Sequence, residues 1–424
     1  MSEAYRQAVE RLFSLQRFGI KLGLVNISRL LRLVGEPRPG KRTIIVGGTN
    51  GKGSVSTMLA SISRAAGYKT GLFTSPHLVS FTERLQIDGR RISREEVVAL
   101  CAQLWAALEP YRRPGEPEPI TYFEMLTAMA SLFFQRNDVD VAVMEVGLGG
   151  RLDATNALPR DLVVLSDIAL DHQRYLGKTL ASIVAEKTSL LRADVPAVAG
   201  GGVDNAAQLV AERADEIGAP LKLLARDFRF EATGDTVRFQ NDAVDFSDLP
   251  TPFVGQHQRR NLAIAVQAAL LLGIDNRETI VAGLAKAVWP GRLETMGKEP
   301  SWLLDCAHNP AAAQCLAAAW TPHEPTVWLL AAMSDKDFAG IIQPLAPLVS
   351  SVICTTLDMP RAASADELAA VVRRHNTRVS VKSDPDEAMA EALRQAGPQG
   401  RILVAGSIFL VGHVRGKLTG ETGP

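Results

Sequence analysis

An apolar, β-branched run at residues 43–46 leads directly into a glycine-rich turn that ends in a lysine and a hydroxyl residue. The whole stretch, residues 43–54, reads TIIVGGTNGKGS. The run predicts a buried strand, and residues 55–66, closed by Gly67, predict a helix. This order of strand, glycine turn and helix indicates an α/β sheet.

The same turn has the composition of a phosphate cradle. Its glycines let the backbone approach an anion closely, and the helix N-terminus supplies partial positive charge. Lys52 adds a full charge for the outer phosphates of a nucleotide, and Ser54 offers a hydroxyl to magnesium. Because Gly53 separates the lysine from the hydroxyl, the pattern argues against the ordinary switch GTPases and kinases. A purely structural glycine turn is the alternative.

The chain has 424 residues, which is enough for two or three domains with sizeable cores. Lysine and arginine together number 46 and are balanced by 46 acidic residues, so the net charge is zero. This balance indicates neither a nucleic-acid partner nor a basic membrane-binding face. Any anion site must therefore be local.

Cysteine usage and the apolar stretches predict a reduced, cytoplasmic protein. The four cysteines are scattered, without the paired spacing of a metal site. Residues 1–13 predict a charged amphipathic helix and not a secretory signal. The longest apolar stretch, residues 262–274, contains Gln267 and is too short to cross a bilayer, so it predicts a buried helix.

Strand-like and helix-like segments alternate along most of the chain, which predicts mainly parallel, doubly wound sheets. A break at Trp-Pro-Gly, residues 289–291, separates a P-loop ATPase-like domain with an N-terminal helical segment, residues 1–289, from a smaller domain, residues 290–424. Residues 222–246 predict a small antiparallel insert. We expect ligands in the cleft between the two open domains. The predicted strands are residues 43–46, 70–74, 139–146, 162–166, 195–199, 302–305, 326–331, 352–355, 379–381 and 402–405.

Polar side chains follow several of these strands, namely Ser75, Glu145 and Asp167, with Asp171 and His172 just beyond. Because the carboxyl ends of parallel strands line one edge of a sheet, these side chains can meet the phosphate loop. Oxygen ligands with one imidazole suit magnesium or manganese better than zinc. A buried carboxylate such as Glu145 needs a partner. Ser75 also fits a plain turn, and His172 also fits a helix cap.

Residues 145–156, EVGLGGRLDATN, superficially match a dinucleotide fingerprint, but Leu152 occupies the third glycine position. This stretch predicts instead a tight loop that carries Arg151 and Asp153 over a pocket. Lys187 lies in a predicted helix, where a lysine is ordinarily solvated, so its position alone assigns it no role.

The second half places a cation, Arg292, at the predicted hinge, where we expect it to contact phosphate. Asp305 ends a strand and His308 follows it, so both are expected to face the nucleotide across the cleft. Asn261 lies at the start of the apolar helix, in GQHQRRN. Capping of the next helix explains Asn309 equally well.

In these segments the chain resembles the folylpolyglutamate synthase/dihydrofolate synthase family of the Mur ligase superfamily. The resemblance covers nearly the whole chain, and eleven motifs in series are far more specific than one. In chain order they are FGIKLGL (18–24), GGTNGKGS (47–54), TSPHLVSFTER (74–84), EVGLGGRLDATN (145–156), DHQRYLGKT (171–179), EK (186–187), GQHQRRN (255–261), PGRLE (290–294), DCAHNP (305–310), DKD (335–337) and GSIFLVG (406–412).

The resemblance implies sites for ATP, for two Mg²⁺ ions and for the pteroate part of a folate. The ATP-binding residues would be Thr49, Asn50, Gly51, Lys52, Gly53, Ser54, Asn261, Arg292, Asp305 and His308. The metal ligands would be Ser54, Ser75, Glu145, His172 and a carbamylated Lys187. The pteroate site would use Lys21, Leu22, Gly23, Leu24, Thr121, Tyr122, Phe123, Glu124, Leu152, Asp153 and Ala154. Catalysis would rest on Lys52, His172, Lys187 and Arg292.

Two positions depart from the family pattern. Thr188 and Ser189 replace the usual Ala-Gly after the carbamylated lysine, so the residues that follow the lysine proposed for modification differ from those in the family. Cys306 stands where glycine is commoner, a change expected to alter only packing.

The implied reaction joins L-glutamate to dihydropteroate, tetrahydrofolate or both, through an acyl phosphate made with ATP. We also expect a monomer with no nucleic-acid or membrane partner. One alternative is a folylpolyglutamate synthase alone, and another is a cell-wall Mur ligase, although TSPHLVSFTER and FGIKLGL favour the folate branch. A nucleotide-dependent switch, the third alternative, leaves Arg292, Asp305 and the metal residues without a role.

Overall fold

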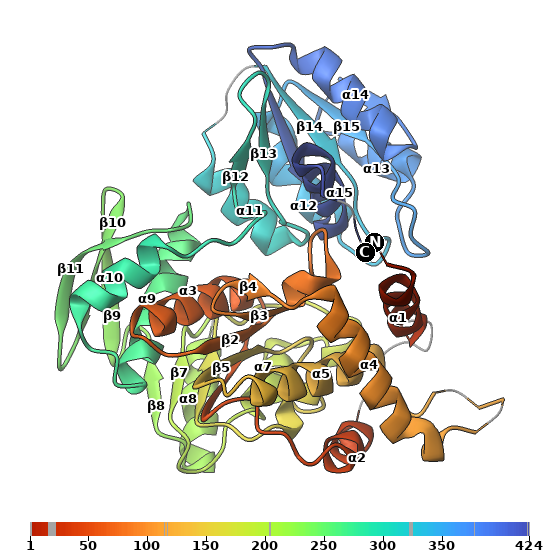
Figure 1. Ribbon diagram of the computed structural model, residues 1–424. Helices are drawn as coiled ribbons and strands as arrows, with labels where there is room; N and C mark the ends of the chain where they lie inside the picture. The colour runs from red at the N-terminus through yellow and green to blue at the C-terminus, as the bar shows by residue number, and fades with distance from the viewer. Residues whose placement is uncertain are drawn as a thin grey trace.

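A computed structural model describes residues 2–15, 23–113, 115–116, 118–202, 205–321, 325–376, 378–421 and 423. Lys21 and Leu22, predicted to bind pteroate, lie outside the described residues. The chain forms two sheet-based units, a larger one below and a smaller one above in Figure 1.

The larger unit is built on an eight-stranded sheet with the order β4-β3-β2-β5-β1-β6-β7-β8. Six of its strands run parallel, and only β3 and β4 are antiparallel to their neighbours. The strands are β1 (Arg42–Gly47), β2 (Thr70–Phe73), β3 (Leu85–Ile87), β4 (Arg90–Arg91), β5 (Val141–Glu145), β6 (Leu162–Leu165), β7 (Ala197–Ala199) and β8 (Leu221–Leu223).

Helices cover both faces of this sheet because its strands are apolar on both sides. In β1, Ile44 and Val46 face one hydrophobic core, whereas Ile45 between them faces the other. The first face is covered by α3 (Lys52–Ala65), α9 (Gln256–Leu271) and α10 (Arg277–Ala285). The second face carries α1 (Glu3–Ser14), α2 (Val25–Leu33), α4 (Arg94–Leu108), α5 (Tyr122–Arg136), α7 (Leu180–Thr188) and α8 (Ala206–Ile217), with the short α6 (Gln173–Leu176) beside α7.

A three-stranded antiparallel sheet extends this unit at the side of α9 and α10 (Figure 1). It consists of β9 (Phe228–Thr233), β10 (Thr236–Asn241) and β11 (Asp245–Pro250). The insert predicted at residues 222–246 is therefore confirmed.

The smaller unit contains a six-stranded sheet in the order β12-β13-β17-β14-β15-β16, in which only β12 is antiparallel. One face carries α11 (Pro310–Ala319), α12 (Phe338–Leu345) and α13 (Ala365–Val372), and the other carries α14 (Pro385–Ala396) and α15 (Ile408–Thr419). The strands are β12 (Glu294–Met296), β13 (Ser301–Leu304), β14 (Thr326–Leu330), β15 (Ser351–Cys354), β16 (Val379–Val381) and β17 (Arg401–Ala405).

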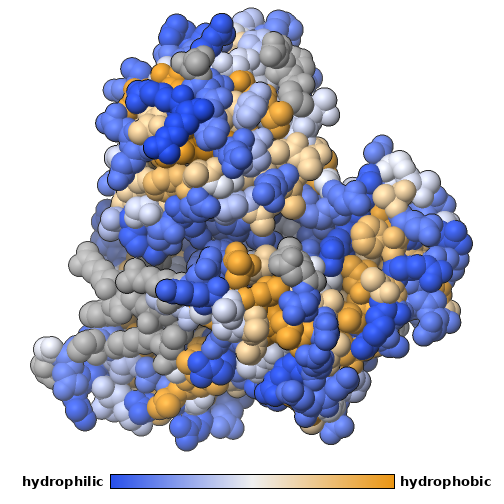
Figure 2. Space-filling model, turned by 180° about the vertical axis from the view of Figure 1, so that it is seen from behind, coloured by the Kyte–Doolittle hydropathy of each residue, from blue (hydrophilic) through white to orange (hydrophobic). Residues whose placement is uncertain are grey.

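The predicted fold class of two open, mainly parallel α/β units is confirmed, and each predicted strand overlaps an observed one. The chain crosses between the units in a linker, residues 286–293, which contains the predicted break. Helix α3 begins at Lys52, earlier than predicted, because Gly51 takes the left-handed conformation at the N-cap and lets the helix start within the glycine turn. No described helix is long and apolar enough to cross a membrane. The face in Figure 2 is largely hydrophilic, with small apolar areas.

Candidate active site

The glycine turn between β1 and α3 holds its backbone in close contact with neighbouring segments. A side chain at Gly48 would meet the hydroxyl of Ser166 at 1.9 Å, and one at Gly51, whose φ is +86°, would meet the amide of Asn261 at 2.4 Å. Asn261 thus packs directly on the turn and is buried. The backbone N–H of Thr49 donates to the carbonyl of Asp167 (2.8 Å), which ties the turn to the end of β6. These contacts fix a loop whose amides can cradle phosphate.

Two lysines converge on this loop. Lys52 Nζ donates to the carbonyls of Gly48 (3.2 Å) and Thr49 (3.1 Å), and Lys187 Nζ donates to the carbonyl of Gly48 (2.7 Å). Lys187 is 3% exposed, so the expectation that a helical lysine is solvated was wrong here. Burial, reinforced by Lys52, lowers the pKa of Lys187 to about 7.

The sequence held a signal for the burial of Lys187. Ile183 and Val184 are buried, and their spacing of four and three residues places Lys187 on the apolar face of α7. A lysine in the apolar stripe of a helix, unlike one on the polar face, must find a buried partner.

Glu145 ends β5 beside the end of β2, as the strand order predicted. It is 4% exposed, and its Oε2 accepts a hydrogen bond from the backbone N–H of Ser75 (3.0 Å). Burial raises the pKa of Glu145, against the opposing effect of Lys52. Ser75 precedes a cis proline and lies at the edge of the sheet next to this carboxylate.

His172 has a positive φ of 50° and occupies the N-cap position of α6, but its side chain caps no backbone N–H. The capping alternative is therefore wrong. Burial lowers the pKa of His172, so the imidazole is neutral at pH 7 and has a free lone pair. His172 lines a small cavity of about 20 Å³ together with Thr49, Lys52, Asp171 and Lys187.

The possible metal ligands at this edge of the sheet come from both sides of the phosphate loop: His172 lines the small cavity, whereas Ser75 and Glu145 line a larger one. Among the described residues, no three histidine, cysteine, aspartate or glutamate side chains gather into a metal-binding group. The candidate donors are one carboxylate (Glu145), one neutral imidazole (His172) and the hydroxyls of Ser54 and Ser75. This set fits magnesium at a nucleotide site, because that ion keeps several waters and binds through one or two carboxylates plus phosphate oxygens.

Residues of the smaller unit approach the same edge. Asn309 Nδ2 donates to Asn50 Oδ1 (3.3 Å) and to Asp171 Oδ2 (3.1 Å), and Lys336 pairs with Asp171 at 3.5 Å. Asn309 also caps α11 through its Oδ1, so the predicted local role is confirmed alongside this contact. The sequence reasoning noted Asp171 but assigned neither it nor Lys336 a role.

Asp305 and His308 lie between the end of β13 and the start of α11. Asp305 accepts hydrogen bonds from the backbone N–H groups of Leu293 (3.0 Å) and Ala307 (2.9 Å), and burial raises its pKa against the opposing effect of Arg292. Burial lowers the pKa of His308 to about 4. Both residues are therefore held by local backbone groups, since His308 Nδ1 contacts the carbonyl of Cys306 at 2.9 Å. Among the described residues, no hydrogen bond or ion pair links either of them to Lys52.

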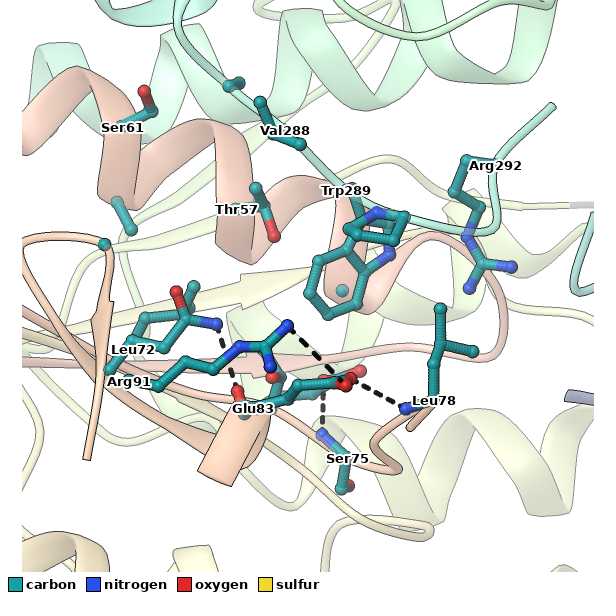
Figure 3. Close-up of a pocket in the computed structure, with 18 of the residues that line it drawn as sticks. Thr57, Ser61, Leu72, Ser75, Leu78, Glu83, Arg91, Val288, Trp289 and Arg292 are labelled. Atoms are coloured by element: carbon teal, nitrogen blue, oxygen red, sulfur yellow. Dashed lines mark hydrogen bonds and ion pairs between the residues drawn. The ribbon is translucent and has the colours of Figure 1, made fainter. Parts of the chain in front are cut away.

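Arg292 forms no ion pair or hydrogen bond with another described residue. It lines a cavity of about 350 Å³ that also reaches Ser75 and Glu145. Figure 3 shows this cavity between α3, strands β2 to β4 and the linker, with the ring of Trp289 over it. A side chain at Gly53 would meet that ring at 2.5 Å, so the linker packs directly on the first turn of α3.

Four of the predicted pteroate residues, 121–124, lie around the first turn of α5, on the face of the sheet opposite to α3. Thr121 is the N-cap of α5, and Phe123 lies 5.7 Å from Phe73, ring to ring. Glu124 receives hydrogen bonds from the backbone of Ile27 and of Thr121. Its carboxylate therefore ties α2 to α5.

The other two predicted pteroate segments also have clear structural roles. Asp153 accepts four hydrogen bonds, from the backbone of Gly147, Leu148 and Thr155 and from the Thr155 hydroxyl. This carboxylate shapes the loop that contains Leu152 and Ala154. Gly23 and Leu24 lead into α2, where Leu24 takes the N-cap position.

Comparison with known proteins places this geometry in a family. Residues 46–269 match the Mur ligase middle domain, and residues 291–408 match the Mur ligase glutamate ligase domain. A "Dihydrofolate synthase/folylpolyglutamate synthase" of Bacillus subtilis is 32% identical over 99% of this chain and 100% of its own length. A relative from Haloferax volcanii, a "Probable bifunctional folylpolyglutamate synthase/dihydropteroate synthase", is 36% identical, but the chain spans only 50% of that protein.

Solved structures agree with these relatives. The structure "E.coli FolC in complex with DHPP and ADP" superposes with a TM-score of 0.88 at 32% identity, over 97% of this chain and 98% of that one. The Mycobacterium tuberculosis folylpolyglutamate synthase complexed with ADP has a TM-score of 0.90 at 30% identity, over 98% and 99% of the two chains. The chain belongs to the Mur ligase superfamily and, within it, to the dihydrofolate synthase/folylpolyglutamate synthase family.

Proposed function

We propose that this protein uses ATP to join L-glutamate to the carboxylate of a folate-type acceptor. The observation that carries the proposal is the cavity at the phosphate loop that is lined by Lys52, His172 and Lys187. The buried carboxylate of Glu145 at the end of β5 interacts electrostatically with the same Lys52. A related enzyme was solved with Mn, AMPPNP and L-glutamate bound, at 33% identity and a TM-score of 0.84 over 97% of this chain and 98% of that one.

A carboxylate is a poor acyl donor, so it first takes the γ-phosphoryl group of ATP. The oxygen of the acceptor attacks the γ-phosphorus, ADP leaves, and the amine of glutamate then displaces phosphate from the acyl carbon. Bringing an acceptor anion within 4 Å of one phosphate charge costs about 4 kcal/mol at an effective dielectric near 20. Lys52, and Arg292 with its unpaired guanidinium, supply charge against this repulsion.

Glu145, His172, Ser54 and Ser75 are the residues that would hold magnesium. The ion would neutralise phosphate charge when bound. The protein itself contributes the buried carboxylate, the neutral imidazole and the fixed loop.

The pKa of Lys187 supports the proposed carbamylation. An amine with a pKa of about 7 is substantially neutral at pH 7 to 8, and only the neutral amine can attack carbon dioxide. The nitrogen bonds to the carbon and releases one proton, which leaves a carbamate with the oxygen ligands that a second metal ion needs. Thr188 is buried and its hydroxyl donates to the carbonyl of Val184, so this departure from the family pattern is paired with the backbone of its own helix.

We further propose that residues 1–289 and 290–424 act as two domains that close on the nucleotide, with Arg292, Asp305 and His308 approaching it across the cleft. Closure would exclude water, which otherwise hydrolyses the acyl phosphate. The protein is proposed to act as a cytoplasmic monomer. Action on both dihydropteroate and tetrahydrofolate is proposed because relatives from Bacillus subtilis and Escherichia coli are dihydrofolate synthase/folylpolyglutamate synthases.

Phosphate release tests the function directly. Purified protein with MgATP should release phosphate only when L-glutamate and a pteroate or folate acceptor are both present. Separate assays with dihydropteroate and with tetrahydrofolate show whether the protein has one of the two activities or both. Release with a nucleotide-sugar peptide acceptor instead would identify a cell-wall ligase, and release without any acceptor would identify a simple ATPase.

A further inference from the structure

Arg84 is a buried cation that the proposed reaction has not used. It is the last residue of a short 3-10 helix, η2 (Phe81–Arg84), that leads into β3. Its carbonyl accepts a hydrogen bond from the backbone N–H of Thr74 (3.0 Å), so its backbone is fixed beside Ser75. Only 6% of the residue is exposed.

Within the part of the chain that the structure describes, the Arg84 guanidinium has one hydrogen-bond partner, and that partner carries no negative charge. Arg84 Nε donates to Nδ1 of His77 at 2.7 Å. Because Nδ1 accepts this bond, the imidazole is neutral, with its proton on Nε2. Among the described residues, no carboxylate lies within 4 Å of the Arg84 guanidinium. The carboxylates of Glu145 and Glu83 interact electrostatically with this guanidinium, but only at longer distance.

A buried arginine stays charged at every physiological pH, and the four N–H bonds of Nη1 and Nη2 remain for another group. An unpaired buried charge is costly, and that cost is offset when an anion arrives. The two terminal nitrogens form a planar fork that matches the two oxygens of a carboxylate. The chemistry of Arg84 therefore calls for an anionic ligand.

The surroundings of Arg84 are aromatic. Its guanidinium carbon lies 5.5 Å from the ring centroid of Tyr122. Phe13 lies 5.7 Å from Tyr122, 6.1 Å from His77 and 6.5 Å from Phe81, ring to ring. Flat rings next to a cation suit a planar aromatic ring that carries a carboxylate.

We propose that Arg84 binds the acceptor's carboxylate on the pteroate side of the sheet and holds it for phosphorylation, with His77 fixing the guanidinium. This inference rests on the proposed function and names a residue outside its ATP, metal and pteroate sets. The ligand class is an aryl carboxylate such as pteroate. The guanidinium of Arg84 would then form an ion pair with the acceptor's carboxylate. Lys52 and Arg292 would offset the negative charge of the ATP phosphates.

Binding of pteroate and of its neutral carboxamide analogue tests the proposal. The wild-type protein should bind the carboxylate about 10- to 100-fold more tightly than the amide, because a charge-assisted fork is lost in the amide. Arg84→Met should abolish this preference and leave amide binding nearly unchanged. Arg84→Lys should restore part of it, because lysine keeps the charge but not the fork.

Arg160→Met is the matched control. Arg160 is another partly buried arginine, but its guanidinium donates to the carbonyls of Asn156, Leu158 and Leu190. The Arg160→Met variant should have a lower free energy of unfolding but the same preference for the carboxylate over the amide. Equal losses of carboxylate and amide binding in Arg84→Met and Arg84→Lys would overturn the proposal.

The failure of this inference can be told apart from failure of the proposed function. If wild-type protein releases phosphate with glutamate and pteroate, the function stands whatever Arg84 does. If wild-type protein binds pteroate and its amide equally, Arg84 is not the carboxylate site although the ligase assignment survives. If Arg84→Met does not fold, Arg84→Lys decides between these outcomes.

Discussion

At the scale of single residues, the site is organised by two cations that share one carbonyl. Lys52 and Lys187 both donate to the carbonyl of Gly48, and their mutual repulsion adds to burial in lowering the pKa of Lys187. Lys187 is therefore prepared to lose its proton, whereas Lys52 is placed to contact phosphate. This division of roles depends on burial depth, because only Lys187 is fully enclosed.

Lys52→Ala should lower ATP-dependent ligation by roughly a thousandfold, because a full positive charge at the transferring phosphate is lost. The free energy of unfolding should fall by only about 1 kcal/mol, since Lys52 contributes hydrogen bonds from a partly exposed position. Phosphate release and chemical denaturation measure the two effects. Lys41→Ala, an exposed lysine far from the loop, serves as control. Near-normal turnover in Lys52→Ala would remove Lys52 from the mechanism.

Single residues also mark where sequence reasoning reached its limit. Glu145 was predictable, because a carboxylate that closes an apolar run must be buried with a partner. The role of Lys187 came only from the family resemblance, since its contact with Gly48 joins positions far apart in the chain. Arg84 gave no signal, because its burial depends on how η2, α1 and α5 pack together.

At the scale of elements, one carboxylate shapes the loop that presents Ser75. Glu83 accepts hydrogen bonds from the backbone N–H groups of Leu78 (2.8 Å), Val79 (3.0 Å) and Ser80 (2.8 Å). Ser80 and Glu83 form a capping box at the start of η2. The S-x-x-E spacing is visible in the sequence, so this role was within reach of sequence reasoning.

Glu83→Ala should lower the free energy of unfolding by about 2 to 3 kcal/mol, because three backbone donors lose their acceptor. Since the freed loop carries Ser75, ligation should also require more magnesium for half-maximal rate. Glu96→Ala is the matched control, because Glu96 forms the same capping box with Ser93 on α4, away from the site. Its cost should be about 1 kcal/mol, with an unchanged magnesium requirement. Unaltered magnesium dependence in Glu83→Ala would show that the loop does not position Ser75.

The elements themselves were largely predictable. Buried parallel strands are short β-branched runs between turn residues, so β1, β5, β6 and β14 stand out in the sequence. Their ends were less certain, as the early start of α3 at Lys52 shows. The pairing of β3 and β4 at the sheet edge was not predicted, because strands of two or three residues are too short to show a hydrophobic period.

At the scale of the whole molecule, the two units meet through few but specific contacts. A side chain at Gly412 would meet the carbonyl of Leu78 at 2.0 Å, so α15 lies directly on the loop that carries Ser75. Glu421 pairs with Arg91 on β4, again joining the two units. No periodicity or motif within one unit encodes these contacts, since they depend on how the linker sets one sheet against the other.

Asp171 is the centre of the polar contact between the units. One of its carboxylate oxygens pairs with Lys336 and the other accepts a hydrogen bond from Asn309, and both of these residues belong to the smaller unit. Both side chains of the Asp171–Lys336 pair are 13% exposed, so solvent screens the pair only partly. Removing it should therefore shift the balance between closed and open arrangements by about 1 kcal/mol, or roughly fivefold in population.

Lys336→Met tests this balance while keeping most of the apolar stem. Small-angle scattering with MgADP should give a larger radius of gyration than for wild type, and kcat/KM for glutamate should fall severalfold. Lys417→Met is the control, since Lys417 pairs with Asp386 within the smaller unit at 2.6 Å. The Lys417→Met variant should leave the radius of gyration and kcat/KM unchanged, because the Lys417–Asp386 pair joins two helices of the same unit. If Lys336→Met lowers kcat/KM but keeps the wild-type radius, Lys336 acts on the substrate and the arrangement of the units is held by the packing of α15 on the Ser75 loop.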